Sequence, residues 1–274
     1  MADPPLVLPF TDPRCREVAL SGGKGASLAT MIASGLRVPP GFVVTSAAFF
    51  AAIDESELRA MARAGEFARV RSTVTASQLP VDLIGQHYAA LGGLVAVRSS
   101  ACAEDSVRAS YAGVQETYLN VGSLDAVLKA IVECWLSFFS ERAVFYREEK
   151  GSLEDVAMAV VVQEMVNSRK SGVLFTVDPV QGRRDRMVVE AAFGLGEAVV
   201  SGNVTPDHYV LDLEGVVKRS RVVDHPVLDE RECRRLAQLG RHVVDIYGSA
   251  QDIEWAIDGA GALMVLQSRP VTTV

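Results

Sequence analysis

Lysine is scarce in this chain of 274 residues, where it supplies only 5 of the 27 basic side chains, against 34 acidic ones. The formal net charge is −7 and the isoelectric point lies near 5.2. General binding to nucleic acid or to an anionic membrane surface depends on an excess of positive charge. We therefore expect neither a nucleic acid nor a membrane among the partners of this protein.

Long apolar runs and paired cysteines are also missing. No uninterrupted apolar run, Val156–Val162 included, is longer than seven residues, far fewer than the ~20 that a membrane-spanning helix needs. The N-terminus has no basic segment followed by an apolar one, so we expect no secretory signal. The four cysteines show no C-x-x-C spacing, which favours reduced thiols and a cytoplasmic location.

The common hydrolytic motifs are absent. The four histidines are scattered, and none stands beside a Ser or Cys motif: His87, His208, His225 and His242. No G-x-S-x-G or H-E-x-x-H pattern occurs, and the spacing of a Walker A loop is missing. These absences argue against a serine hydrolase, a zinc protease and a P-loop enzyme.

What is present is a globular composition, with 49% hydrophobic residues, 22 Gly and 11 Pro. Apolar residues at helical spacing predict helices after Gly22, over most of 45–90, and over 124–139 and 229–248. Short apolar runs, many rich in Val, predict strands, and residues 99–117 read as a loop. The expected strands lie near 38–44, 94–98, 117–121, 156–162, 172–177, 187–192, 208–212, 253–257 and 263–269.

This pattern is typical of a mixed α+β protein. A long helix ends near Lys150–Gly151. We therefore expect two subdomains, an N-terminal one over 1–150 and a C-terminal one over 151–274.

Two segments suggest an anion site. Glycines in Gly22–Gly25 would let backbone N–H groups approach a phosphate, and Lys24 would add charge. Arg98 ends an apolar strand, where arginine often clamps a planar anion. The structural alternatives are a helix-opening turn with a solvated Lys24, and an ion pair of Arg98 with Glu104 or Asp105.

The C-terminal segments suggest a metal–phosphate site. Glu254, Gln267 and Arg269 each lie within an apolar run, where an unpartnered charge would be costly. Adjacent antiparallel strands would bring them together, and their groups suit a Mg²⁺–phosphate complex. The structural alternative is a buried Glu–Arg ion pair that only holds the strands in register.

Two further segments are weaker candidates. Gly113 and Thr117 flank the end of the expected loop, where a glycine would permit close approach of the backbone to phosphates. Gln163, Glu164 and Val166 follow an apolar strand, and such a segment could offer backbone groups to a base edge. The alternatives are an ordinary turn glycine and the polar end of a strand.

The order of these segments resembles the N-terminal ATP-binding domain of the phosphoenolpyruvate synthase and pyruvate phosphate dikinase family, which includes the rifampicin phosphotransferases. The resemblance covers nearly the whole chain. Its matching stretches are GGKGASLATMIASGLRVPPGFVVT (22–45), AVRSSACAEDSVRASYAGVQETYLNV (96–121), VVQEMVNSRKSGVLFTVDPVQG (161–182), EAAFGLGEAVVSGNVTPDHYVLD (190–212), and DIEWAID with LMVLQSRPVT (252–272).

The resemblance implies an ATP-grasp-like α+β fold whose two subdomains hold ATP in the cleft between them. Lys24 and Arg98 would contact ATP phosphates, and Gly113 and Thr117 would belong to the loop over them. Gln163, Glu164 and Val166 would line the adenine side. Glu254 and Gln267 would hold Mg²⁺ and Arg269 would pair with phosphate, so that Arg98, Arg269 and Glu254 take part in the chemistry.

The resemblance also implies that the β-phosphoryl group of ATP passes to a histidine on a separate domain or subunit, with AMP and phosphate as the other products. That histidine domain, with a motif like T-G-G-x-x-S-H, and an acceptor-substrate domain would be the partners. None of the four histidines lies in such a motif. A nucleotide-binding regulatory or interaction module without turnover is the alternative function.

Overall fold

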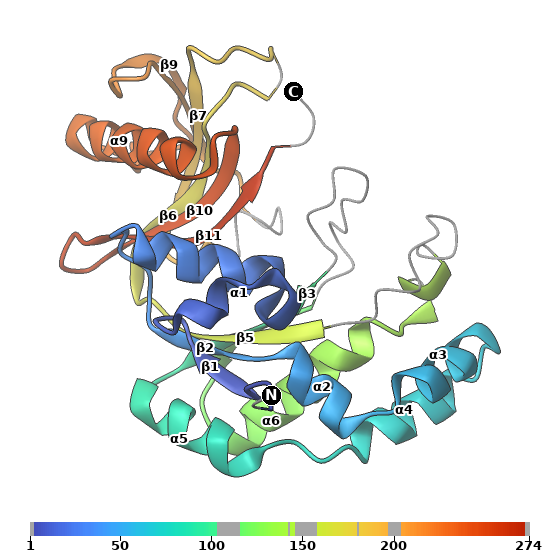
Figure 1. The fold of residues 1–274 in the computed structure, drawn as a ribbon. Helices are drawn as coiled ribbons and strands as arrows, with labels where there is room; N and C mark the ends of the chain where they lie inside the picture. The colour runs from blue at the N-terminus through green and yellow to red at the C-terminus, as the bar shows by residue number, and fades with distance from the viewer. Residues whose placement is uncertain are drawn as a thin grey trace. The chain divides into compact units, whose positions relative to one another are not determined.

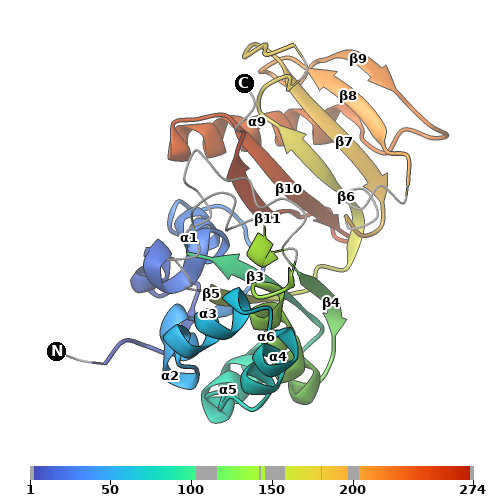
Figure 2. The ribbon, with the colours of Figure 1, turned by 90° about the vertical axis from the view of Figure 1, so that its right-hand side faces the viewer.

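The structure is a computed structural model that describes residues 3–102, 116–141, 143–145, 158–179, 181–196 and 204–271. The chain forms two compact units, one from Met1–Thr30 with Pro40–Met165 and one from Met31–Pro39 with Val166–Val274. Each unit contains one antiparallel sheet and helices (Figures 1 and 2). The predicted mixed α+β class is confirmed.

The compact units change over at Met165, after the strand that ends at Glu164. The division that we predicted, 1–150 and 151–274, falls among residues outside the described set and stays a prediction about the subdomains. Within the described residues, no helix is both long enough and apolar enough to cross a membrane.

The sheet of the first unit has the strand order β1-β2-β5-β3-β4. Its strands are β1 (Val7–Pro9), β2 (Gly41–Val44), β3 (Val95–Ala101), β4 (Thr117–Val121) and β5 (Met158–Glu164). Strand β5 pairs with β2 and β3 on either side and is buried along almost its whole length. Its run of valines has no polar alternation because helices cover both faces of the sheet.

Helices cover both faces of this sheet. Helix α1 (Val18–Ala33) lies on one face, and α5 (Val81–Leu91) and α6 (Leu124–Ser137) lie on the other (Figure 1). The second face builds the main core, where Phe42, Val97 and Trp135 are nearly or fully inaccessible. Among the described residues, this unit also contains η1 (Pro13–Arg16), which is a 3-10 helix, α2 (Ser46–Ala52), α3 (Glu55–Arg63) and α4 (Phe67–Thr75).

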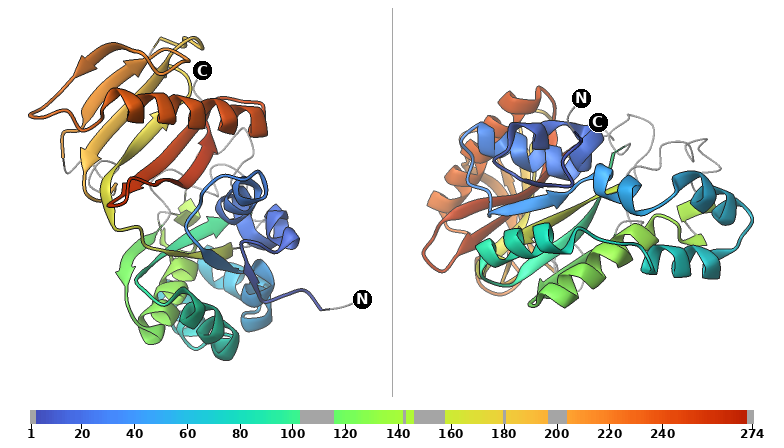
Figure 3. Two further views of the ribbon diagram at one scale, coloured as in Figure 1. Left: turned by 90° about the vertical axis from the view of Figure 1, so that its left-hand side faces the viewer. Right: turned by 60° about the horizontal axis from the view of Figure 1, so that its bottom comes forward.

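The sheet of the second unit has the order β11-β10-β6-β7-β8-β9. Its strands are β6 (Ser168–Phe175), β7 (Met187–Phe193), β8 (Asp207–Leu211), β9 (Val217–Arg221), β10 (Gln251–Asp258) and β11 (Leu263–Pro270). Helix α9 (Glu230–Tyr247) lies across one face of this sheet (Figure 3, left). Gly240 of α9 permits this close packing, because a β-carbon there would lie 3.0–3.3 Å from Met187 and Leu174.

Most local expectations are confirmed. Ser123 caps α6, Asp229 and Glu232 form the predicted capping box of α9, and Gly248 ends α9 in a left-handed conformation. The expected loop beginning at residue 99 is wrong at its start, because Ser99–Ala101 continue β3 and pair with Met158–Val160. Strands β1 and β9 were not predicted, since neither combines length with an apolar run.

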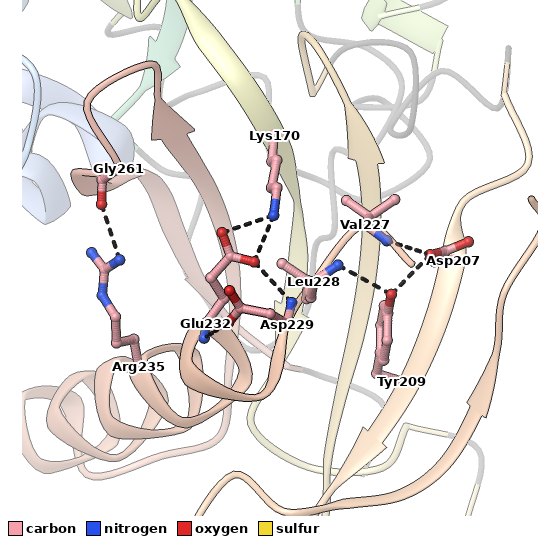
Figure 4. A network of polar contacts seen from close by, with 9 residues as sticks. All are labelled: Lys170, Asp207, Tyr209, Val227, Leu228, Asp229, Glu232, Arg235 and Gly261. Atoms are coloured by element: carbon pink, nitrogen blue, oxygen red, sulfur yellow. Dashed lines mark hydrogen bonds and ion pairs between the residues drawn. The ribbon is translucent and has the colours of Figure 1, made fainter. Parts of the chain in front are cut away.

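A buried ion pair fastens α9 to the sheet (Figure 4). The Nζ atom of Lys170, on β6, donates to both carboxylate oxygens of Glu232 at 2.8 and 2.6 Å. Both side chains are at most about one-tenth exposed. Because Glu232 also accepts from the backbone N–H of Asp229, one carboxylate joins the start of α9 to the middle of the sheet.

A second buried carboxylate holds the connection that leads into α9 (Figure 4). Asp207 accepts from the backbone N–H groups of Val223 and Val227 and from the Tyr209 hydroxyl, at 2.8–2.9 Å. The Tyr209 oxygen in turn accepts from the N–H of Leu228. Burial raises the pKa of Tyr209 to about 12, so this hydroxyl keeps its proton at neutral pH and remains a donor to Asp207.

We expect Glu232→Ala to lower the free energy of unfolding of the second unit by about 3–5 kcal/mol, because it leaves the buried Lys170 charge without its partner. The double variant Lys170→Met/Glu232→Leu should recover most of this loss. Urea denaturation monitored by tryptophan fluorescence would measure both. Glu230→Ala is the matched control, since its ion pair with Arg234 is exposed and is worth at most ~1 kcal/mol. Equal losses in Glu232→Ala and Glu230→Ala would contradict the expectation.

Candidate functional site

In the first unit, the candidate polar residues share one face of the sheet. Arg98 on β3 lies opposite Thr117 on β4 and Val161 on β5, and Gln163 lies opposite Ala96. Directly opposed residues, and residues two apart on a strand, point to the same face. Arg98, Thr117 and Gln163 therefore lie on one face, opposite to the core that α5 and α6 cover.

Helix α1 covers this same face. A β-carbon on Gly25 would lie 2.9 Å from Val43 and 3.7 Å from Val161, and these two valines are opposed in register on β2 and β5. The residues differ in their exposure: Gln163 is 2% exposed, Arg98 is partly buried and Thr117 is exposed. The face thus holds an amide in its interior and a hydroxyl at its edge, with the guanidinium group between them.

The glycine segment interrupts α1 at its beginning. Gly22 has φ 67° and ψ 173°, so the helix is kinked at this residue. A β-carbon at Gly22 would lie 2.2 Å from the Ser100 carbonyl oxygen, which leaves no room for any side chain. Two residues later, the Nζ atom of Lys24 donates to the Ser99 carbonyl oxygen at 2.9 Å. The kink therefore brings Lys24 to the residue that follows Arg98.

The end of β5 and the residues directly after it lead out of the first sheet. Gln163 lies between Ala96 and Gly41 in the sheet, and the N–H of Glu164 donates to the Pro40 carbonyl at 2.8 Å. Val166 belongs to the second compact unit, and its carbonyl oxygen accepts from the N–H of Ser168. The three residues thus stand where the chain passes from one unit to the other.

In the second unit, Glu254 on β10 and Gln267 on β11 are directly opposed. The next pair on the same face is Asp252 and Arg269, also directly opposed. All four side chains lie on the face away from α9, because Ile253 and Trp255 between them are fully buried. The prediction that antiparallel strands bring Glu254, Gln267 and Arg269 together is confirmed.

A shift in register makes this arrangement possible. Glu254 pairs with Gln267 but Trp255 pairs with Val265, so Leu266 is left without an opposite residue. Without the shift, Val265 and Gln267 would point to the same face, since they are two residues apart. The one-residue bulge lets Val265 join Trp255 in the core while Gln267 joins Glu254 on the polar face.

The ion pair of Arg269 is made with Asp252. The Nε and Nη2 atoms of Arg269 each lie 2.8 Å from one carboxylate oxygen of Asp252. The structural alternative for this site named Glu254 as the partner, and sequence reasoning missed Asp252. Burial raises the pKa of Asp252, although the adjacent Arg269 charge opposes this shift.

Two more residues missed by sequence reasoning continue this polar face. Glu190 on β7 lies in the same transverse row as Glu254, since Val173 on β6 is opposite both. His208 on β8 is opposite Glu190, and its Nδ1 atom lies 3.9 Å from the Glu190 carboxylate. Glu190 is the only charged residue in the otherwise apolar run of β7, and this isolated charge was the available signal.

Some predicted positions lie outside the described residues. These are Gly113 and the two alternative partners of Arg98, Glu104 and Asp105. Among the residues that the structure does describe, no three His, Cys, Asp or Glu side chains converge as a metal site. Glu254 and Gln267 nevertheless fit Mg²⁺, which commonly binds one or two protein oxygens and completes its shell with water and substrate phosphates.

Comparison with protein families identifies the class. The model of the pyruvate phosphate dikinase AMP/ATP-binding domain matches residues 18–224 and 212–274. The chain therefore belongs to the family of pyruvate phosphate dikinase AMP/ATP-binding domains, as its motifs predicted.

The chain is also similar in sequence to proteins with names. A probable phosphoenolpyruvate synthase from Methanothermobacter thermautotrophicus is 39% identical over 309 residues, covering 94% of this chain and 45% of the relative. A rifampicin phosphotransferase from Streptomyces sviceus is 40% identical over 303 residues, covering 94% and 35%. The chain thus spans less than half the length of these relatives.

Solved structures show weaker likeness. D-alanyl-alanine synthetase A from Vibrio cholerae aligns with 89% of this chain and 56% of its own, at a TM-score of 0.39 and 13% identity.

We expect Gly22→Ala to destabilise the first unit by about 3 kcal/mol or more. The variant combines a left-handed backbone with overlap between its β-carbon and the Ser100 carbonyl. Gly65→Ala is the matched control, because Gly65 has a similar φ of 72° but nothing within 4 Å of an added β-carbon. That control should cost only ~1 kcal/mol. Thermal unfolding followed by circular dichroism would compare them, and equal losses would show that the contact with Ser100 is unimportant.

Proposed function

We propose that this chain is the ATP-binding component of a dikinase-type phosphotransferase. In this proposal it transfers the β-phosphoryl group of ATP to a histidine on a separate domain or subunit, and AMP and phosphate are released. The fold would be ATP-grasp-like, with ATP held between the two subdomains. The observation that carries the proposal is the β10–β11 register, which aligns a carboxylate, an amide and a guanidinium on one polar face.

The second unit carries side-chain oxygens for a metal ion and a guanidinium group for phosphate, as the binding of a nucleoside triphosphate requires. Glu254 and Gln267 would hold Mg²⁺ through their side-chain oxygens, and Arg269 would face phosphate oxygens. When bound, Mg²⁺ would offset the negative charge of the phosphate chain. Asp252 restrains the Arg269 guanidinium through Nε and Nη2, so the arginine is already oriented before a nucleotide arrives.

The first unit supplies cationic groups and the base-binding segment. Lys24 and Arg98 would contact the phosphates, and Thr117 beside Arg98, with Gly113, would belong to the loop over them. Gln163, Glu164 and Val166 would line the adenine. The location of Gln163 and Glu164 at the end of a central strand supports this role, because the backbone there is held by neighbouring strands. Arg98, Arg269 and Glu254 would stabilise the charge that shifts during transfer.

The acceptor would come from outside this segment of sequence. Relatives named as phosphoenolpyruvate synthase and rifampicin phosphotransferase are more than twice as long as the matched region. We propose a phosphohistidine domain and an acceptor-substrate domain as partners. The alternative is a nucleotide-binding regulatory or interaction module without turnover. The catalytic function is favoured by the joint presence of Lys24, Arg98, Glu254, Gln267 and Arg269.

We expect Mg-ATP to raise the melting temperature, with a stabilisation of about 2.7 kcal/mol when ATP is present at 100 times its Kd. Arg98→Ala and Arg269→Ala should weaken ATP binding by about tenfold or more while leaving adenosine binding nearly unchanged. Arg219→Ala, on exposed β9, is the control and should bind ATP normally. Thermal shift and calorimetric titration would measure these effects. An unchanged melting temperature at millimolar Mg-ATP would contradict ATP binding.

Turnover should depend on the histidine partner. With a matching histidine-domain protein, the chain should release AMP from labelled ATP, and alone it should release only traces, because no nucleophile then faces the β-phosphorus. Glu254→Gln should lower the partner-dependent rate by about 10²–10³-fold, whereas Glu230→Gln, at an exposed position of α9, should not. Chromatography of the labelled products would give the rates. Robust AMP release by the chain alone would refute the transfer mechanism, and ATP binding without any partner-dependent AMP would favour the module.

A further inference from the structure

The kink in α1 is spanned by a side chain from another element. In an unbroken α-helix, the N–H of Gly25 would donate to the carbonyl of Ser21, four residues earlier. Gly22 lies between them with non-helical dihedral angles. The Ser100 hydroxyl, from β3, contacts both groups: it donates to the Ser21 carbonyl at 2.8 Å and accepts from the Gly25 N–H at 3.3 Å.

This hydroxyl is an interior group. Ser100 has no exposed surface and lies opposite Ala159 of the central strand β5. A buried hydroxyl normally has both its donor and its acceptor functions satisfied, and here both are used on the same turn of α1. Ser100 also points to the face that carries Arg98, since the two residues are two apart on one strand.

These contacts restrain the chain on both sides of Lys24. Its backbone lies between Ser21 and Gly25, which the Ser100 hydroxyl joins, and its Nζ atom is bound to the carbonyl of Ser99. Two consecutive residues of β3 thus hold both ends of Lys24. Gly22 completes the fit, since only a residue without a β-carbon can approach Ser100 so closely.

We propose that Ser100 is a positioning residue for the phosphate-binding lysine. Its hydroxyl replaces the helical hydrogen bond that the glycine kink interrupts, and so holds Lys24 in the orientation needed to meet a phosphate. The proposal rests on the proposed function, because it assigns Ser100 a role that acts through Lys24. Positioning of this kind lowers the loss of conformational entropy when ATP binds.

The test is a double-mutant cycle on Mg-ATP affinity, measured by calorimetric titration with adenosine as the second ligand. Ser100→Ala should weaken ATP binding by about tenfold with little change for adenosine. Lys24→Ala and the double variant Lys24→Ala/Ser100→Ala should bind ATP equally weakly, because the loss of Ser100 acts through Lys24. Ser100→Cys, whose thiol can make weaker hydrogen bonds, should fall between Ser100→Ala and the unaltered chain.

Ser46→Ala is the matched control. Ser46 is also a buried serine, and its hydroxyl donates to the carbonyl of Ala19 in the same helix α1 at 2.6 Å, but it does not touch the kink. This variant should lose stability while keeping its ATP affinity within about twofold. Additive losses in the cycle, or equal ATP affinities of Ser100→Ala and Ser46→Ala, would overturn the positioning role.

Failure of the proposed function and failure of the role of Ser100 give different results in this experiment. If the unaltered chain binds no ATP, the proposed function fails and the role of Ser100 fails with it. If the unaltered chain binds ATP and the cycle is additive, only the role of Ser100 fails. Should Ser100→Ala not fold, Ser100→Cys carries the cycle: its loss of ATP affinity should vanish in the Lys24→Ala background, and persistence of that loss would refute the proposal.

Discussion

The burial of one face of β10 beneath α9 is the constraint on which the second unit depends. Ile253, Trp255 and Ile257 are at most 1% exposed, and a slip of one residue would exchange them for Asp252, Glu254 and Ala256. Such a slip would place two carboxylates in an apolar core, at a cost of several kcal/mol each. The apolar residues therefore determine where the acidic residues point. The Lys170–Glu232 ion pair adds a second constraint, because it joins α9 to the sheet at one position.

The first unit uses the same alternation for a different purpose. On β3, Val95 and Val97 enter the core that α5 and α6 cover, so Ala96, Arg98 and Ser100 face α1. This face is not uniformly polar, and Val43 and Val161 pack there against Gly25. Helix α1 can therefore pack closely on the sheet, while polar groups of α1 and of β3 contact one another beside these valines. Gly22 and Ser100 are complementary, because Gly22 has no side chain and Ser100 occupies the space that a side chain at Gly22 would fill.

Much of the fold could be predicted from local pattern. The start of α6 and both ends of α9 followed from Ser123, Asp229, Glu232 and Gly248, because capping depends on residues within a few positions of each other. Edge strand β9 could not be predicted, since all five of its residues are exposed and no apolar periodicity marks it. The extension of β3 through Ser99–Ala101 was also hidden. Its small and polar residues resemble a loop, and only pairing with a strand some sixty residues later in the chain makes them a strand.

The sequence by itself determined the family, through the order of its motifs, and it identified Glu254, Gln267 and Arg269 as a group. It did so because these residues stand out against apolar neighbours in adjacent strands. The tertiary structure alone decided their partners and directions. The bulge at Leu266 turns Gln267 toward Glu254, and Arg269 meets Asp252 two residues before the expected glutamate. Ser100 became visible only in three dimensions, because its contacts with Ser21 and Gly25 join residues far apart in the chain. Hydrogen bonds between distant segments leave no period or spacing in a sequence, and so they appear only when the chain is folded.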